Sequence, residues 1–309
     1  MKKLSVVLFL ACCAAAALAA DLVSRTGAVK DAYNFWFYIP DSIAAWKKAP
    51  AAHAGAEPAD SMVACLVDSI GHFIPSPKPL IVFLHGASLC GRNLDRVLTY
   101  GTIDAIEMGY RPDAYVLAPH NPGGAWSPKK IMKLIRWAQD NYNVDSTRVY
   151  AIGMSLGGYG TLDLAAAYPD RIAAAVALCG GATASNLDAL NAVPLWIMHG
   201  TADRAVAVAQ SDRVVAAMRG GQGETPRLIF DRISGMNHSG LARVLYLPQT
   251  YDWLLAHSLL DVRRPVREAA YDPSSGVLSG AYKSYRGAVR PGFVKKTKKK
   301  KSSRRRRRR

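Results

Sequence analysis

Short apolar segments alternate with amphipathic ones from residue 80 onward, and this alternation strongly limits the folds open to the chain. Six segments of five to seven residues are apolar along nearly their whole length, which is typical of strands buried on both faces. Such strands, alternating with helices, predict an α/β fold whose mostly parallel sheet is covered by helices on both faces. The expected strands are 80–85, 114–119, 148–153, 173–179, 194–199 and 227–231, and the expected helices are 93–108, 129–141, 156–168, 206–219 and 249–259.

One domain over residues 21–262 accounts for this pattern. The segment NFWFYI at 34–39 adds an aromatic-rich strand before the alternation begins. Residues 41–79 are rich in Ala, Pro and Ser and have weak periodicity, so we expect a surface insertion or a cap beside a site there. Periodicity fades after the last expected helix, which predicts a linker over 263–294.

The N-terminus has the features of a secretory signal peptide. Two lysines precede an apolar run, and alanines at positions 17 and 19 provide a cleavage site. We therefore exclude residues 1–20 from the fold and expect a secreted or periplasmic protein. A lipoprotein is disfavoured because the residues before Cys12 and Cys13 fit a lipidation site poorly. No later stretch has the length and apolarity expected of a transmembrane segment in the mature chain.

Three cysteines, Cys65, Cys90 and Cys179, remain after signal cleavage, so at least one of them is unpaired within the chain. An oxidising compartment permits one disulfide, and the sequence leaves the three possible pairings open. The chain has no C-x-x-C pair and no His/Cys cluster of the kind that holds a metal ion. We therefore expect neither a metal site nor a cofactor.

The basic charge of the chain is concentrated at its C-terminus. Residues 295–309 carry twelve Lys and Arg side chains and no acidic one, so the net charge of +17 falls to +5 for the rest of the chain. Such a run is typical of a disordered tail. Lys and Arg runs bind polyanions without sequence preference, which favours an anionic surface of glycans or lipid head groups as a partner. Specific nucleic-acid binding is not expected because the tail lacks interleaved aromatics. A solvated appendage is the alternative.

The motif G-M-S-L-G at 153–157 joins an expected strand to an expected helix. A nucleophilic serine on such a turn adopts strained backbone angles, and only small residues fit two positions before and after it. Ser155, flanked by Gly153 and Gly157, is therefore the candidate nucleophile. This turn would place its hydroxyl at the carboxyl end of the sheet, where ligands bind in such folds.

A serine hydroxyl needs a base and an orienting carboxylate, which follow it in the order acid, then histidine, in this arrangement. His238 lies in a glycine-flanked loop after the last expected strand, whereas His199 ends a strand and His257 lies in a helix. His238 is therefore the candidate base. Asp203 follows the preceding strand and is the candidate acid. Asp231 competes with it, but lies on the strand that leads to the candidate base.

A developing oxyanion needs two N–H donors. The N–H of Leu156, at the start of the helix that follows the serine, supplies one. The loop after the first strand of the alternation supplies the other, for which we favour Ala87. We interpret His85 as a structural residue below the site. Ser88 is either a plain loop hydroxyl, which we favour, or a third donor that contacts the substrate.

Five segments together resemble α/β-hydrolase serine esterases over roughly residues 34–259: LHGAS, APHNPGGAW, NYNVDSTRVYAIGMSLGGYGT, WIMHGTADRAV and GMNHS. They are most similar to secreted predicted-peptidase and phospholipase/carboxylesterase-like proteins, and feruloyl esterases and polyhydroxybutyrate depolymerases are related in pattern. The resemblance implies the α/β-hydrolase fold in a single domain. It further implies a catalytic triad of Ser155, Asp203 and His238, with Leu156 and Ala87 as oxyanion donors.

Trp126, in the loop after strand 114–119, resembles an aromatic residue near the acyl pocket of such enzymes. Packing of that loop against the domain is an equally weighted alternative for this side chain. The 41–79 insertion and the basic tail depart from the family pattern. These departures leave the shape of the pocket mouth, and hence the substrate, open.

The sequence thus predicts a secreted serine hydrolase that cleaves carboxylic esters through an acyl-enzyme. A small-molecule or polysaccharide-linked ester, such as an acyl or feruloyl group on a polysaccharide, is the substrate that the resemblance implies. Two alternatives stay open. A serine peptidase would use the same triad on an amide, and a non-catalytic binding module would be tethered to polyanions by the basic tail.

Overall fold

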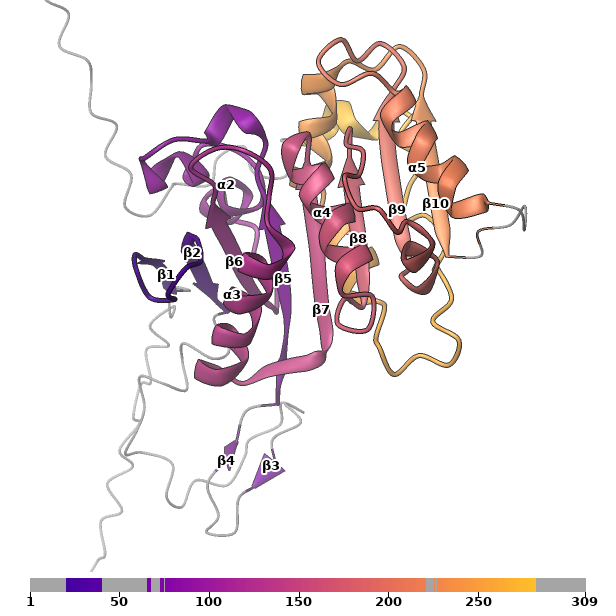
Figure 1. Cartoon of the computed structure of the whole chain (residues 1–309). Helices are drawn as coiled ribbons and strands as arrows, with labels where there is room; N and C mark the ends of the chain where they lie inside the picture. Colours follow the sequence, from indigo (N-terminus) through magenta and orange to yellow (C-terminus); the bar gives the residue numbers. More distant parts are fainter. Residues whose placement is uncertain are drawn as a thin grey trace, which may run out of the picture.

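The folded chain is seen in a computed structural model that describes residues 21–40, 66–67, 73–74, 76–220, 225 and 227–281 (Figure 1). At its centre is a sheet of eight strands. In spatial order they are β1 (Asp21–Arg25), β2 (Asn34–Ile39), β6 (Tyr115–His120), β5 (Lys78–Leu84), β7 (Val144–Met154), β8 (Ala174–Leu178), β9 (Leu195–Gly200) and β10 (Leu228–Ile233).

The strands from β6 to β10 in this order are all parallel, and β1 and β2 add an antiparallel edge. Strands β6, β8 and β9 are buried at every position, as their continuous apolar runs predicted. A separate antiparallel pair, β3 (Leu66–Val67) and β4 (Phe73–Ile74), lies within the predicted 41–79 insertion. Most of that insertion lies outside the described residues. The predicted α/β fold with a mostly parallel sheet is confirmed.

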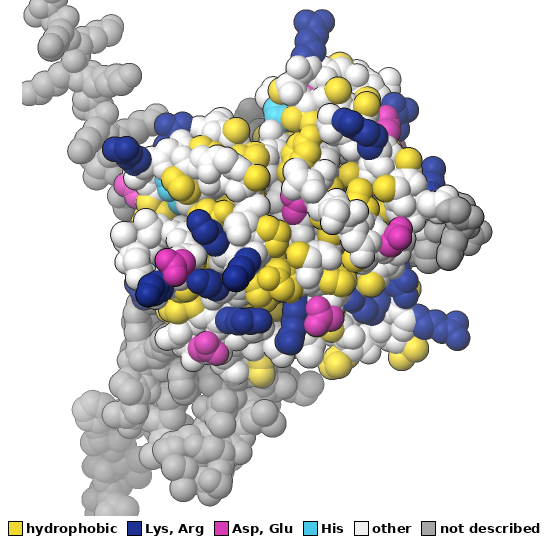
Figure 2. Space-filling model, in the orientation of Figure 1, with side chains coloured by type: hydrophobic (Ala, Val, Ile, Leu, Met, Phe, Trp, Pro, Cys, Tyr) yellow, Lys and Arg dark blue, Asp and Glu magenta, His cyan; other side chains and the backbone are white. Residues whose placement is uncertain are grey.

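One face of the sheet is covered by the helices α3 (Pro128–Asn141), α4 (Leu156–Ala167) and α5 (Ala209–Arg219), which lie in front of the sheet in Figure 1. From β5, Leu80, Val82 and Leu84 pack on this face. On the molecular surface, basic side chains gather over α3 (Figure 2). Lys129 and Lys130 are among the exposed residues of that helix.

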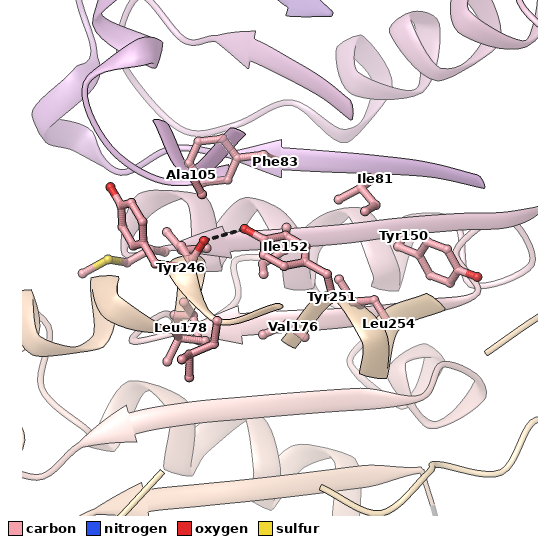
Figure 3. Close-up of a cluster of buried hydrophobic side chains, with 14 of the residues drawn as sticks. Ile81, Phe83, Ala105, Tyr150, Ile152, Val176, Leu178, Tyr246, Tyr251 and Leu254 are labelled. Atoms are coloured by element: carbon pink, nitrogen blue, oxygen red, sulfur yellow. Dashed lines mark hydrogen bonds between the residues drawn. The ribbon is translucent and has the colours of Figure 1, made fainter. Parts of the chain in front are cut away.

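The opposite face is covered by α2 (Thr102–Glu107), η4 (His238–Tyr246) and α6 (Pro248–Leu255). Ile81 and Phe83 of β5 pack on this face, because successive side chains of a strand point to opposite faces of the sheet. Figure 3 shows this cluster, in which the Tyr251 side chain lies against the sheet. The Tyr251 hydroxyl donates a hydrogen bond to the carbonyl of Leu245 at 2.7 Å, so its polar end is satisfied within the core.

The stretch predicted as one helix over 93–108 is divided into η2 (Leu94–Leu98) and α2. Gly101 separates them with a φ of 94°, and a Cβ at this position would overlap the ring of Phe83. The break between η2 and α2 therefore depends on a contact with strand β5, which the hydrophobic periodicity of residues 93–108 does not reveal. The remaining short 3₁₀ helices are η1 (Ala87–Leu89), η3 (Asp188–Ala192) and η5 (Val277–Gly280).

The described part of the predicted linker, residues 263–281, packs against the sheet. The guanidinium of Arg264 donates to the carbonyl of Pro169 at 2.8 Å, and the rings of Tyr271 and Trp196 lie 5.0 Å apart. The folded unit therefore continues past residue 262.

Several sequence predictions fall outside the described residues, namely the signal peptide at 1–20, the basic tail at 295–309 and Cys65. Cys90 and Cys179 have free thiols, so the pairing between these two is not formed. Within the described ranges, every helix is too short or too polar to cross a membrane.

Candidate active site

Ser155 occupies the turn between β7 and α4, where its φ of 59° and ψ of −121° are strained for a residue with a side chain. Its N–H donates to the carbonyl of Leu178 at 2.8 Å, which ties the turn to β8. Glycine is needed on both sides, because a Cβ on Gly153 would overlap Gly157, and one on Gly157 would overlap the backbone of Leu84. The sequence thus forms the sharp strand-to-helix turn that the G-x-S-x-G motif predicts.

A cavity of about 620 Å³ lies beside this turn, at the carboxyl ends of the strands. It brings together five of the residues singled out from the sequence: Ser155, Leu156, Ala87, Ser88 and His238. The remaining lining residues are Gly86, Tyr100, Met154, Tyr159, Ala205, Val206, Ser239 and Ala242. Most of these side chains are apolar, so the cavity suits an uncharged acyl group near the serine.

His238 and Asp203 are joined by a short hydrogen bond of 2.6 Å between Nδ1 and Oδ2. The His238 side chain is 25% exposed and that of Asp203 is 0% exposed, so the imidazole lies at the cavity and the carboxylate lies behind it. Because an ionised carboxylate only accepts, Nδ1 carries the proton of this bond. Nε2 is then the ring nitrogen left to accept a proton.

Asp203 is held by its own loop. Its Oδ1 accepts the backbone N–H groups of Ala205 at 2.8 Å and Val206 at 2.9 Å. Burial by itself would raise the pKa of Asp203, but the hydrogen bonds from Val206, His238 and Ala205 outweigh burial and hold that pKa below its ordinary value. The carboxylate is therefore ionised at neutral pH and can orient the imidazole.

The two predicted oxyanion donors begin helices. Leu156 is the first residue of α4 and Ala87 the first of η1, so neither N–H has an acceptor within its own helix. Both residues line the cavity, Ala87 from the loop after β5 and Leu156 beside Ser155. The arrangement can direct two N–H groups at one oxygen atom.

The loop after β5 is fixed by His85, which the sequence predicts to be a structural residue, and by Tyr100 and Asn121, for which the sequence makes no prediction. The Gly86 N–H donates to the Tyr100 hydroxyl at 2.9 Å, and the Asn121 N–H donates to His85 Nε2 at 3.0 Å. His85 Nδ1 lies 2.8 Å from the carbonyl of Gly86, and burial lowers the pKa of His85 to about 4. His85 is thus a neutral bridge below the cavity. No motif in the sequence marks Tyr100, because its role depends on a contact between loops.

Comparisons with known proteins show which proteins this chain resembles. Residues 113–229 match the model of the family described as "Putative esterase". Acetylxylan esterase A from Emericella nidulans is 39% identical over 61 residues, which cover 20% of this chain and 19% of that protein. Poly(3-hydroxyalkanoate) depolymerase C from Paucimonas lemoignei is 27% identical over 126 residues, or 35% of this chain and 29% of that protein. The matched segments span less than a third of the length of these relatives.

Solved structures extend the likeness to most of the chain. A thermostable esterase superposes with a TM-score of 0.53 and 22% identity, covering 77% of this chain and 63% of that chain. The feruloyl esterase module from Clostridium thermocellum gives a TM-score of 0.50 and 14% identity, covering 74% and 86%. The chain has the α/β-hydrolase fold. The predicted resemblance to α/β-hydrolase esterases is confirmed, and the family match supports carboxylic ester hydrolysis.

Trp126 is not among the residues that line the cavity at Ser155. It is 4% exposed, and its indole N–H donates to the carbonyl of His85 at 3.2 Å. Its ring lies 5.0 Å from that of Tyr33 and fits against Gly160, where a Cβ would meet the indole at 2.7 Å. This position matches the loop-packing alternative for Trp126.

One group of side chains resembles a metal site in its composition. The ligand atoms of Cys179, Asp203 and His238 lie within 4.8 Å of one another. Asp203 and His238 are already hydrogen-bonded to each other, and burial raises the pKa of the Cys179 thiol to about 12. A metal ion needs the thiolate, which such a pKa disfavours at neutral pH. The group therefore fits a catalytic pair beside a buried thiol better than a metal centre.

Proposed function

We propose that the protein is a serine hydrolase that cleaves carboxylic esters through an acyl-enzyme, with Ser155 as nucleophile, His238 as base and Asp203 as the orienting acid. The observation that carries this proposal is the 2.6 Å hydrogen bond between His238 Nδ1 and Asp203 Oδ2, beside a cavity that both Ser155 and His238 line. This tautomer leaves His238 Nε2 to accept the proton of the serine.

In the proposed reaction, Ser155 Oγ attacks the ester carbonyl while His238 Nε2 takes the hydroxyl proton. The carbonyl oxygen becomes an oxyanion, which the N–H groups of Leu156 and Ala87 stabilise. The C–O bond to the alcohol then breaks, and His238 returns the proton to the leaving alkoxide. Water, deprotonated by His238, then attacks the acyl-enzyme. The bond between the acyl carbon and Ser155 Oγ breaks, His238 returns the proton to Ser155 Oγ, and the carboxylic acid is released. Asp203 stays ionised throughout, as its lowered pKa allows.

For the substrate, we propose acyl or feruloyl esters on polysaccharides. The names of the relatives support this class, because they include acetylxylan esterases and a feruloyl esterase module. The mostly apolar lining of the cavity suits the acyl part of such esters. A panel of acetyl and aryl esters, feruloyl sugars and aminoacyl amides tests the class. Faster turnover of the amides than of every ester would instead favour the peptidase alternative.

We also propose that the enzyme acts outside the cytoplasm. Support comes from the two lysines, the apolar run and the alanine pair within residues 1–20. Expression of the full chain followed by fractionation and N-terminal sequencing tests this point. A protein that retains residues 1–20 in the cytoplasm contradicts it.

Labelling with a fluorophosphonate probe tests the nucleophile. We expect the probe to modify Ser155, as mapped by peptide mass spectrometry, and the Ser155→Ala variant to lose labelling and at least 10³-fold of ester hydrolysis, about the range seen when a triad member is removed. Ser88→Ala and Ser239→Ala alter the other hydroxyls of the same cavity and serve as matched controls that keep the label.

Full ester hydrolysis by a folded Ser155→Ala variant would overturn the assignment. A wild-type protein that hydrolyses no ester or amide, yet binds an anionic surface, would favour the binding-module alternative. Circular dichroism of each variant checks that the fold is retained.

A further inference from the structure

A second cavity lies along the helix that begins after Ser155. Its volume is about 390 Å³, which is in the range of small-ligand sites, and it is bordered by the start of α3, by α4 and by the loop that follows β8. Among the described residues, none lines both this cavity and the one at Ser155, so the two are separate. The proposed reaction uses no side chain of the second cavity, so its role has to be sought elsewhere.

Apolar groups line the second cavity from two helices that lie on the same face of the sheet (Figure 1). Pro128 is the first residue of α3 and Trp126 lies two positions before it, whereas Ala166 and Ala167 end α4. The ring of Trp126 is held against Gly160 of α4, where a Cβ would meet the indole at 2.7 Å. This side of the cavity is therefore an apolar wall supported by the packing of the helices.

Polar groups line the second cavity from the loop after β8, which a buried carboxylate holds in place. Asp163 of α4 is 5% exposed, and its Oδ1 accepts the backbone N–H groups of Thr183 at 2.6 Å and Ala184 at 2.9 Å. Its Oδ2 accepts the Thr183 hydroxyl at 2.6 Å. Two exposed residues follow, Ser185 and Asn186. Within the part of the chain that the structure describes, the Ser185 hydroxyl and the Asn186 NH₂ group have no hydrogen-bond partner.

The chemistry of this lining fits a neutral sugar ring. A sugar presents apolar C–H groups, which suit the wall formed by the helices, and hydroxyls that both donate and accept hydrogen bonds. Ser185 and Asn186 supply free donors, and the hydroxyl oxygens of Thr183 and Ser185 accept. Among the residues that line the cavity, the one charged side chain is Asp163, whose negative charge disfavours phosphate or carboxylate groups.

The two cavities lie along one side of α4. Ser155, Tyr159 and Asp163 follow one another at intervals of four residues, which places them on the same side of the helix. Tyr159 lines the first cavity and Asp163 the second. The loop after β8 follows this side, since a Cβ on Gly181 would lie 2.8 Å from the ring of Tyr159 and Thr183 binds Asp163. Eight residues of helix span about 12 Å, so an oligosaccharide joined to the ester at Ser155 can reach the second cavity, whereas a small ester cannot.

We propose that the second cavity is a subsite that binds a neutral sugar ring of the polysaccharide whose ester is cleaved at Ser155. The identity of this chain as the substrate rests on the proposed function, whereas the binding of a sugar can be measured without any hydrolysis. A subsite remote from the reacting bond adds binding energy that only a long substrate can use. It would therefore make the enzyme favour esters on polysaccharides over small esters.

Isothermal titration calorimetry of the full chain with unesterified hexasaccharides of xylose, glucose and mannose tests the binding. We expect at least one of them to bind, and the Ser185→Ala/Asn186→Ala variant to bind it about tenfold more weakly, because hydrogen bonds to the sugar are lost. The Asn141→Ala/Ser279→Ala variant removes the same types of side chain at exposed positions outside both cavities and is the matched control. Failure of all three sugars to bind the wild type, or equal affinities in the variant and the control, would overturn the proposal.

Kinetics on substrates of two lengths tests the link to the reaction. We compare kcat/KM for an acetyl or feruloyl ester of the hexasaccharide that binds with kcat/KM for a small aryl ester. This ratio is expected to fall by about tenfold in Ser185→Ala/Asn186→Ala and in Ala167→Trp, which fills the cavity from the exposed end of α4 without changing the loop. An unchanged ratio in both variants, with circular dichroism showing that they are folded, would overturn the subsite. A wild type that binds the hexasaccharide but hydrolyses no ester would overturn the proposed function instead and leave the titration to decide the sugar site.

Discussion

At the scale of a single residue, the carboxylate of Asp203 decides which nitrogen of His238 carries the proton. In Asp203→Asn, the amide oxygen keeps the N–H groups of Ala205 and Val206, so the amide NH₂ turns toward His238. Nδ1 must then accept, and the ring proton moves to Nε2, the nitrogen that takes the proton of Ser155 in the proposed reaction. We expect kcat to fall by about 10³–10⁴-fold with little change in KM, measured by steady-state kinetics on an aryl ester.

Asp231, the alternative candidate for the acid, makes its hydrogen bond away from the cavity. Asp231 accepts the indole N–H of Trp196 at 2.7 Å and does not line the cavity. The Asp231→Asn variant is therefore the matched control, and we expect it to keep most of the activity. A fall in kcat of less than about tenfold in Asp203→Asn, with a larger fall in Asp231→Asn, would reverse the assignment of the acid.

At the scale of an element, the loop that carries Ala87 depends on a phenol from a different loop. The Gly86 N–H donates to the Tyr100 hydroxyl at 2.9 Å. Tyr100→Phe keeps the ring but leaves this N–H without its acceptor, a loss worth about 1–3 kcal/mol. Because the Ala87 N–H then loses its fixed direction, we expect kcat to fall by about tenfold and KM to change little. Steady-state kinetics checks this, with Tyr168→Phe at the C-terminal end of α4 as the control variant. Equal kcat values in the two variants would contradict the prediction.

The strands were predictable because burial on both faces leaves a continuous apolar run, which a single sequence displays directly. β9 is expected at 194–199 and spans Leu195–Gly200, whereas β7, expected at 148–153, begins four residues earlier and spans Val144–Met154. β1 was not expected, since Asp21–Arg25 has no such run and is ordered by pairing with β2. An edge strand of this kind takes its structure from its neighbour, and the neighbour is not visible in the segment itself.

Some residues of the candidate site could likewise be predicted from the sequence, and others could not. The glycines around Ser155 are required by the geometry of a single turn, so the G-x-S-x-G motif predicts them. His199 was expected only to pack at the sheet edge, and its contacts with Ser211 and Asp203 arise when α5 folds against β9. The position of Trp126 likewise depends on Gly160, which belongs to another element. Residues that act within one turn can be recognised in a sequence, whereas a site that is assembled from several elements becomes visible only in the folded structure.

At the scale of the whole molecule, two groups of basic side chains can be distinguished. Residues 295–309 carry twelve basic side chains, and exposed lysines also lie on α3 (Figure 2). Among the described residues, those that line the cavity at Ser155 include no lysine of α3. We therefore predict that binding to an anionic surface and the proposed ester hydrolysis use separate parts of the protein, and that each can be removed without the other.

A chain that lacks residues 295–309 tests this separation, with Lys129→Glu/Lys130→Glu in the full chain as the matched change on α3. Each phosphate or carboxylate contact releases bound counterions, so twelve clustered charges give binding that falls steeply with salt. We expect the shortened chain to lose retention on anionic vesicles at both low and physiological salt. The value of kcat/KM on an aryl ester is expected to stay within about twofold, since the described residues that line the cavity are unchanged. The α3 variant is expected to keep most of its retention. Loss in the α3 variant alone would make that helix, and not the C-terminal segment, the surface that holds the enzyme near a polyanion.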